Sequence, residues 1–150
     1  MCRKKNHKEG ATMPGKEDLR PGLKHTESVV VTKELTVPEI SSAYTGLADM
    51  PTVFATAYLL GFVEWTCLEA VKPYLEPGER TVGTAIDMRH TAATPVGMRV
   101  TAEVELTAVN GRMLEFSFIC RDAVEEIAKG THGRAIIGLE RFMAKVSQKG

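Results

Sequence analysis

Three side chains of this 150-residue chain stand out because they can move or orient protons, namely Glu64, His90 and Thr56. Glu64 interrupts an apolar segment, where an ionised carboxylate is costly unless it is paired or hydrogen-bonded. His90 shares a predicted strand face with Ile86 and Met88, and this face should pack against the helix that bears Glu64. A histidine and a carboxylate that meet across such a contact can act as an acid/base pair. The contact can equally be a structural His–Glu hydrogen bond, and the pattern leaves both interpretations open.

Thr56 precedes Glu64 by eight residues, which is about 12 Å along a straight helix. At that separation the two side chains cannot bond directly, but both can flank one ligand near the start of the helix. The alternative is that Thr56 is simply a small helix residue.

Two further positions lie in segments that are unusual for strands. Gly83 allows a ligand to approach the backbone closely, or it marks a β-bulge. Arg134 follows His132 in the segment KGTHGRA, and it can pair with an acidic ligand or with a core carboxylate. The chain has no phosphate-binding glycine loop, nucleophile elbow or zinc motif. We therefore predict a site that uses no metal and no cofactor.

The elements that position these residues follow from hydrophobic periodicity. Residues Thr52–Leu75 predict one long helix, capped by Thr52 and apolar all round, which is typical of a buried helix. Alternating patterns predict strands at about 24–37, 82–92, 98–108, 114–120 and 127–139. Asn110-Gly111 indicates a tight hairpin. The order strand, long helix, four strands predicts an α+β domain, with a five-stranded antiparallel sheet wrapped around one central helix.

Composition sets the remaining expectations. Residues 1–23 are polar and predict a disordered or loosely attached tail, which leaves residues 24–150 as one folded domain. The 19 basic and 19 acidic side chains balance, so neither nucleic acid nor a membrane is an expected partner. The three cysteines argue against a disulfide framework, and no signal peptide is evident, so a cytoplasmic protein is expected. An open sheet edge predicts pairing with a second copy, and therefore a homodimer.

Three separated segments resemble one known family. They are VFATAYLLGFVEWTC, VGTAIDMRHTAATP, and GTHGRA followed by LERFMAKV. Together they resemble the fluoroacetyl-CoA thioesterases, which are hot-dog-fold acyl-CoA thioesterases. The similarity runs from about residue 26 to the C-terminus and keeps the spacing between the segments. It implies a hot-dog fold that dimerises through the sheet edge.

The resemblance also implies roles for individual residues. It places the catalytic threonine, glutamate and histidine of the family at Thr56, Glu64 and His90. Gly83 falls near the thioester and Arg134 near the active site. Met50 stands where the fluoroacetate-specific enzyme has a gating phenylalanine.

The predicted function is hydrolysis of a short-chain acyl-CoA to a carboxylate and free CoA. Glu64 would act either as the nucleophile or as a general base on water. Two alternatives remain at this stage. One is a non-catalytic acyl-CoA binding module, and the other is a hydratase or dehydratase acting on an acyl thioester with the same fold.

Overall fold

The computed structural model describes residues 13–150. Its main elements are β1 (Lys24–Val30), α1 (Thr56–Val71), β2 (Glu79–His90), β3 (Arg99–Asn110), β4 (Met113–Arg121), β5 (Glu126–Gly138) and α2 (Leu139–Val146). Short 3₁₀ turns connect them: η1 (Lys16–Asp18), η2 (Lys33–Leu35), η3 (Val37–Glu39), η4 (Leu47–Asp49), η5 (Lys72–Tyr74) and η6 (Ser147–Lys149). The predicted order of one strand, one long helix and four strands is confirmed.

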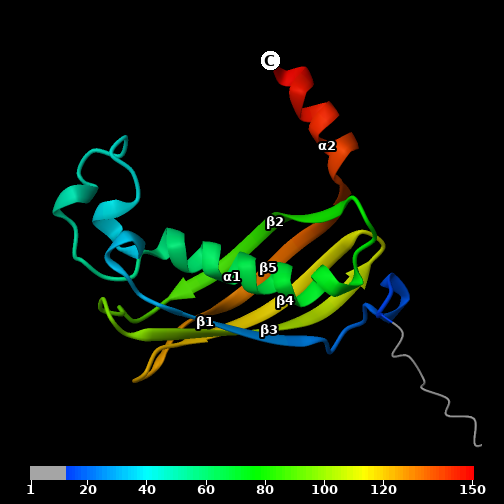
Figure 1. Cartoon of the computed structure of the whole chain (residues 1–150). Helices are drawn as coiled ribbons and strands as arrows, with labels where there is room; N and C mark the ends of the chain where they lie inside the picture. Colours follow the sequence, from blue (N-terminus) through cyan, green and yellow to red (C-terminus); the bar gives the residue numbers. More distant parts are fainter. Residues whose placement is uncertain (1–12) are drawn as a thin grey trace, which may run out of the picture.

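The sheet is antiparallel throughout and has the strand order β1-β3-β4-β5-β2. It curves around α1, which lies across its concave face (Figure 1). The hairpin between β3 and β4 turns at Gly111, whose φ of 60° is the left-handed conformation that glycine adopts readily. Among the described strands, β2 lies at an edge of the sheet and pairs only with β5. The predicted α+β architecture, a five-stranded sheet wrapped around one helix, is confirmed.

The core lies between α1 and the middle of the sheet, formed by β3, β4 and β5. The predicted inner faces of β3 and β4 are confirmed, because alternate residues there are fully or almost fully buried. These residues are Val100, Ala102, Val104, Leu106, Leu114, Phe116, Phe118 and Cys120. From α1, residues such as Leu59, Val63 and Cys67 pack against them. Burying a side chain of this size contributes roughly 1.5–3 kcal/mol, so the interface fixes α1 firmly on the sheet.

α1 is shorter and less enclosed than predicted. It begins at Thr56 instead of Thr52, because the preceding residues are extended and donate backbone hydrogen bonds from Phe54 to Thr94 and from Ala55 to Leu35. It ends at Val71, where a 3₁₀ turn containing Pro73 follows. The helix is also not buried on all sides, because Trp65 is 43% exposed. One side of α1 is therefore open within a single chain.

The first strand is also shorter than predicted. β1 ends at Val30, and the following residues form 3₁₀ turns in which the Thr36 hydroxyl donates to the Lys33 carbonyl. Thr36 then forms a β-bridge with Phe54 instead of extending β1. Predicting one strand over residues 24–37 was wrong because valine spacing does not reveal this local turn.

Ordered structure starts before residue 24. Leu19 is only 6% exposed, and the backbone N–H of Gly22 donates to the Leu106 carbonyl. Lys16 pairs with Glu79 at 2.6 Å. A loosely attached segment therefore does not describe these residues, whose two apolar contacts with the core, Leu19 and Leu23, are too sparse a signal to predict. Residues 1–12 of the predicted tail lie outside the described residues, and the division at residue 23 remains a prediction.

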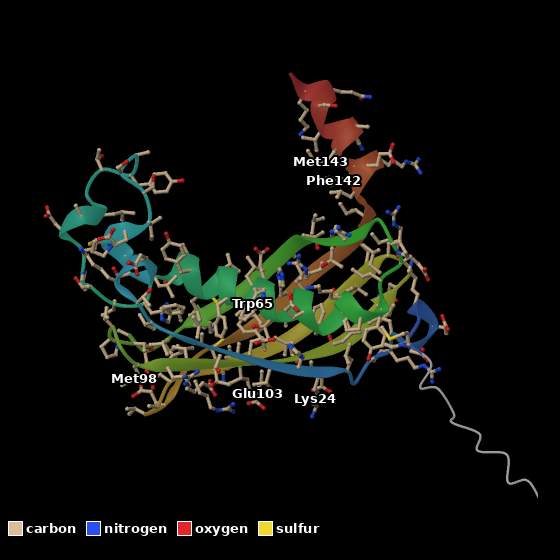
Figure 2. All side chains as sticks on the ribbon, in the orientation of Figure 1. Lys24, Trp65, Met98, Glu103, Phe142 and Met143 are labelled. Atoms are coloured by element: carbon tan, nitrogen blue, oxygen red, sulfur yellow. The ribbon has the colours of Figure 1, made fainter. Side chains whose placement is uncertain are left out.

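α2 continues directly from β5 and projects away from the body of the domain (Figure 1). Figure 2 shows Phe142 and Met143 on this projecting helix, where both side chains are exposed. Between residues 13 and 150, no helix has both the length and the apolar character needed to cross a bilayer.

Candidate active site

Thr56 and His90 form the first part of the site, at the N-terminal end of α1. Thr56 is the first residue of the helix and His90 is the last residue of β2. The Thr56 hydroxyl and His90 Nδ1 are 2.8 Å apart. His90 Nε2 is buried and has no hydrogen-bond partner among the described residues. Burial lowers the pKa of His90, and the backbone of Ala92 opposes this shift only in part. The ring is therefore neutral at physiological pH and can accept a proton.

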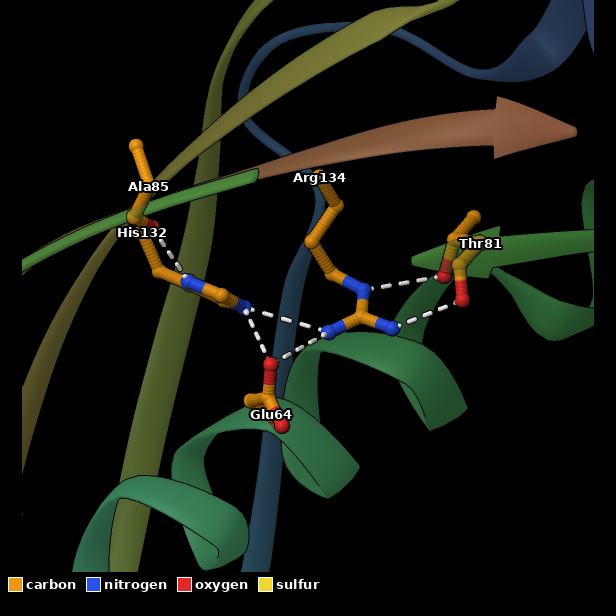
Figure 3. A network of polar contacts seen from close by, with 5 residues as sticks. All are labelled: Glu64, Thr81, Ala85, His132 and Arg134. Carbon is orange, nitrogen blue, oxygen red and sulfur yellow. Dashed lines mark hydrogen bonds and ion pairs between the residues drawn. The ribbon is translucent and has the colours of Figure 1, made fainter. Parts of the chain in front are cut away.

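Glu64 lies two turns further along α1, in a second cluster (Figure 3). Its Oε1 is 3.5 Å from Nη1 of Arg134 and 3.9 Å from Nε2 of His132. The carboxylate is 44% exposed, whereas the Arg134 side chain is only 5% exposed. A buried cation thus faces a carboxylate that remains open to solvent or to a ligand.

Arg134 is fixed by three hydrogen bonds (Figure 3). Its Nε donates to the Thr81 hydroxyl at 2.9 Å, and its Nη2 donates to the Thr81 carbonyl at 2.8 Å. Its Nη1 lies 3.1 Å from His132 Nε2. Burial lowers the pKa of Arg134 while Glu64 opposes this shift, so the guanidinium stays charged. The result is a rigid cation whose position does not depend on Glu64 alone.

Gly83 leaves the space that Glu64 occupies. A Cβ atom at this position would overlap Oε1 of Glu64 and would lie 3.3 Å from Cε1 of His132. The register of β2 against β5 shifts between Gly83 and Ala85. This bulge lets Gly83 and, three residues later, Ile86 both lie on the face toward α1, which strict alternation would forbid. The β-bulge expected at Gly83 is present, and the group that approaches its backbone is the Glu64 side chain.

Met50 lies immediately after η4, in the connection that precedes α1. Its side chain is 48% exposed. Figure 1 shows this connection beside the N-terminal end of α1, which is the end that carries Thr56. Met50 is six residues from Thr56 in the chain and fourteen residues from Glu64.

The structure does not bring His90 to Glu64 within one chain, so the predicted direct contact across the helix–sheet interface is wrong. The residue of β2 that lies level with Glu64 is Gly83, and His90 is seven residues further along the strand. The expectation for Thr56 holds, because it sits two turns from Glu64 and makes no direct bond to it. Six predicted residues therefore divide between two clusters and one loop.

Sequence reasoning missed His132 and Thr81 as site residues. A signal for His132 was present, because His132 and Arg134 are two residues apart in a strand and so share one face. The neighbouring glycines add to it, since a Cβ at Gly130 would overlap the Asp87 carbonyl and one at Gly133 would lie 2.9 Å from the Thr84 hydroxyl. These glycines let β5 approach β2 closely. No group of three or more potential metal ligands occurs in the described part of the chain.

Known proteins that resemble this chain belong to one family of thioesterases. The sequence profile of the fluoroacetyl-CoA-specific thioesterases matches residues 24–140. A curated fluoroacetyl-CoA thioesterase from Streptantibioticus cattleyicolor is 47% identical over 134 residues, which cover 89% of this chain and 96% of that protein. The solved structure of a variant fluoroacetyl-CoA thioesterase in complex with acetyl-CoA is 46% identical, with a TM-score of 0.85, and covers 87% of this chain and 98% of that one.

A more distant structure supports the architecture. The crystal structure of a hot-dog-like protein from Thermanaerovibrio acidaminovorans is 22% identical, has a TM-score of 0.73, and covers 86% of this chain and 91% of that one. Together with the curved sheet around α1, these matches define a hot-dog-fold thioester hydrolase. Within that class, the chain belongs to the fluoroacetyl-CoA-specific thioesterase family. The predicted resemblance and fold are thereby confirmed.

Proposed function

We propose that this chain hydrolyses the thioester bond of short-chain acyl-CoA, and that Glu64 is the residue on which the reaction depends. The observation that carries this assignment is the contact between an open carboxylate and a buried cation, Glu64 and Arg134. A carboxylate held in one position by a fixed cation is pre-organised to attack or to deprotonate. The reaction uses no metal and no cofactor.

Glu64 has two chemically complete roles. As a nucleophile it attacks the acyl carbonyl and expels the CoA thiolate, and water then cleaves the resulting anhydride. As a general base it removes a proton from a water molecule that attacks the same carbonyl. In both roles the carbonyl oxygen becomes negatively charged. Two backbone positions can stabilise this negative charge. The one nearer to Glu64 is at Gly83, whose backbone adjoins the carboxylate.

His90 and Thr56 supply proton transfer and orientation. The neutral ring of His90 takes up the proton that water releases, and the protonated ring then gives this proton to the CoA thiolate. Thr56 fixes the orientation of the ring through the contact to Nδ1. The other oxyanion position is the start of α1, where no side chain caps the free backbone amides.

Met50 contributes to the choice of acyl group. It is an unbranched, flexible side chain that adapts to differently shaped neighbours. One methylene in an apolar pocket changes binding by only about 1–3 kcal/mol in any case. We expect hydrolysis of several small acyl-CoAs, with no large preference for fluoroacetyl over acetyl.

The test is to measure kcat/KM for acetyl-, propionyl- and fluoroacetyl-CoA with a dye that traps free thiol. Release of CoA at comparable efficiency from all three substrates supports the proposal. A binding module would release none, and a hydratase would consume acyl-CoA without releasing thiol. A preference of many thousand-fold for fluoroacetyl-CoA would show that Met50 does not relax the selectivity.

The working form is a homodimer in which a second copy pairs along β2. One side of this twelve-residue strand has no strand partner among residues 13–150, and Ile86 near its middle is exposed. Long unpaired strands are normally covered in native proteins. The open side of α1 at Trp65 and the projecting α2 both present apolar surface as well.

Light scattering tests the dimer. The parent chain should be dimeric at micromolar concentration, and Ile86→Lys should shift it toward the monomer. Val124→Lys is the matched control, because Val124 is exposed in the connection between β4 and β5. A monomeric parent would contradict the proposal. We also propose a cytoplasmic location, which the three cysteines support because their number and spacing do not suit a disulfide framework. The balanced charge supports the absence of nucleic acid and membrane partners.

A further inference from the structure

The reaction proposed above uses Glu64, His90 and Thr56, but it leaves a buried histidine without a role. His132 on β5 is 3% exposed and contacts the cluster around Glu64. Its two ring nitrogens make different contacts, and each contact restricts the protonation state of the ring.

The contacts of His132 define one tautomer. Nδ1 lies 2.7 Å from the Ala85 carbonyl oxygen, which can only accept, so Nδ1 carries the proton. Nε2 lies 3.1 Å from Nη1 of Arg134, which can only donate, so Nε2 must be unprotonated. A doubly protonated ring would lose this acceptor and place two positive charges side by side. The network therefore requires the neutral ring.

His132 completes the set of acceptors around Arg134. Thr81 accepts hydrogen bonds from Nε and Nη2 of Arg134, and His132 accepts one from Nη1. The planar guanidinium then directs the remaining Nη1 hydrogen toward Oε1 of Glu64 at 3.5 Å. We infer that His132 is a positioning residue, which in its neutral Nδ1–H form directs Arg134 at Glu64 and so holds the carboxylate for thioester hydrolysis.

The surroundings keep the ring neutral. Burial lowers the pKa of His132 and the charge of Arg134 lowers it further, while the Ala85 carbonyl and Glu64 oppose this shift. Cys67, also on α1, is neutral because burial raises the pKa of its thiol to about 12. The register partners of His132, Ile86 on β2 and Phe116 on β4, do not titrate. Acidification below the lowered pKa of His132 should therefore release Arg134 from its orientation.

Two variants separate positioning from packing. His132→Gln can place its side-chain oxygen near the position of Nε2, so it keeps a neutral acceptor for Arg134 at every pH. His132→Phe keeps the ring volume and removes the acceptor. We expect His132→Phe to lower kcat by about 100-fold, since a misplacement of about 1 Å can cost that much. KM for acetyl-CoA should change by less than about threefold, because His132 acts on the carboxylate and not on binding.

His132→Gln should recover most of the lost kcat and should flatten the acid limb of the pH profile. A structural role alone would change the melting temperature of both variants without this rescue. Retention of parental kcat by folded His132→Phe, or equal loss in both variants, would overturn the inference.

A second measurement does not depend on activity. Nitrogen-15 NMR of the parent, with the His132 signals identified by their loss in His132→Gln, should show a protonated Nδ1 and a bare Nε2 at pH 7. An Nε2–H tautomer or a doubly protonated ring would also overturn the inference. Because the inference rests on the proposed role of Glu64, Glu64→Gln is measured in parallel. Full activity of that variant would refute the role of Glu64, whereas the NMR result reports on His132 alone.

Discussion

Two histidines contact the machinery on α1, and they differ in how fully their nitrogens are satisfied. Both nitrogens of His132 have partners, and the ring is almost completely buried. His90 uses Nδ1 toward Thr56 and leaves Nε2 unpartnered in the described chain. An unpaired buried nitrogen is costly, so it is retained where it serves a purpose. A satisfied histidine fixes its neighbours, and an incompletely satisfied one keeps capacity for proton transfer.

The largest loss of kcat should come from changing Glu64, the carboxylate that His132 positions through Arg134. Glu64→Gln keeps the shape and a hydrogen-bonding head, but it removes the charge, the nucleophile and the base. We expect kcat to fall by about 10²–10⁴-fold, with the melting temperature nearly unchanged. The control is Glu69→Gln, which alters a surface pair with Lys72 on the same helix. Activity within a few-fold of the parent would make Glu64 a structural residue.

Replacing the two histidines should lower the melting temperature by different amounts. His90→Ala removes the unpartnered Nε2 and also Nδ1, whose partner Thr56 is exposed and can bond to water instead. We therefore expect about 100-fold lower kcat with only a small change in melting temperature. His132→Ala strands the Ala85 carbonyl and a buried Arg134 donor, which costs about 1–3 kcal/mol for each group. Thermal unfolding followed by circular dichroism measures both. Equal melting temperatures for the two variants would remove the distinction between them.

Gly83→Ala tests whether the position of Glu64 matters independently of its charge. The added Cβ overlaps Oε1 of Glu64, whose flexible side chain can move aside. We expect about tenfold lower kcat and a folded protein, in keeping with the sensitivity of catalysis to small displacements. Gly138→Ala at the end of β5 is the matched control, since no atom lies within 4 Å of its added Cβ. If Gly83→Ala has the same kcat as the parent, catalysis tolerates a displaced Glu64 carboxylate.

The smallest expected effect is on the pH dependence of stability. The folded state lowers the pKa of His132, so the unfolded chain binds a proton more readily as the pH falls below about 6.5. The free energy of unfolding should therefore decrease between about pH 6.5 and the lowered pKa, and remain constant above that window. Urea titrations of the parent and His132→Gln measure this, and the variant should show the weaker dependence. An identical dependence would argue that His132 is not the group being protonated.

The fold could be predicted because its signals are local. Alternation in β3 and β4 identifies their buried faces, and Asn110-Gly111 identifies the turn between them. The long apolar stretch of α1 identifies the element around which the sheet curves. The start of α1 could not be placed, because residues 53–55 are held extended by partners that are distant in sequence, such as Leu35 and Thr94.

The site was only partly predictable for a related reason. The residue types of Glu64, His90 and Arg134 are visible in the sequence, but their pairing depends on register. The bulge between Gly83 and Ala85 sets which β2 residue meets Glu64, and strict alternation cannot reveal it. The role inferred for His132 depends on two acceptor–donor contacts that exist only once β2 and β5 are side by side.

The strand order also has a consequence for how the protein is made. β2 is synthesised before β3, β4 and β5, but within the described residues it pairs only with β5, and the bonds from Arg134 to Thr81 join residues 53 positions apart. Bringing together residues so far apart in sequence costs loop-closure entropy, and this cost precedes any stabilising contact. During synthesis, β2 therefore has no strand partner from the described part of the chain until β5 has left the ribosome. The contacts of Arg134 with Thr81 and Glu64 therefore cannot form before β5 has been synthesised, and a nascent chain that lacks β5 has no cation beside Glu64.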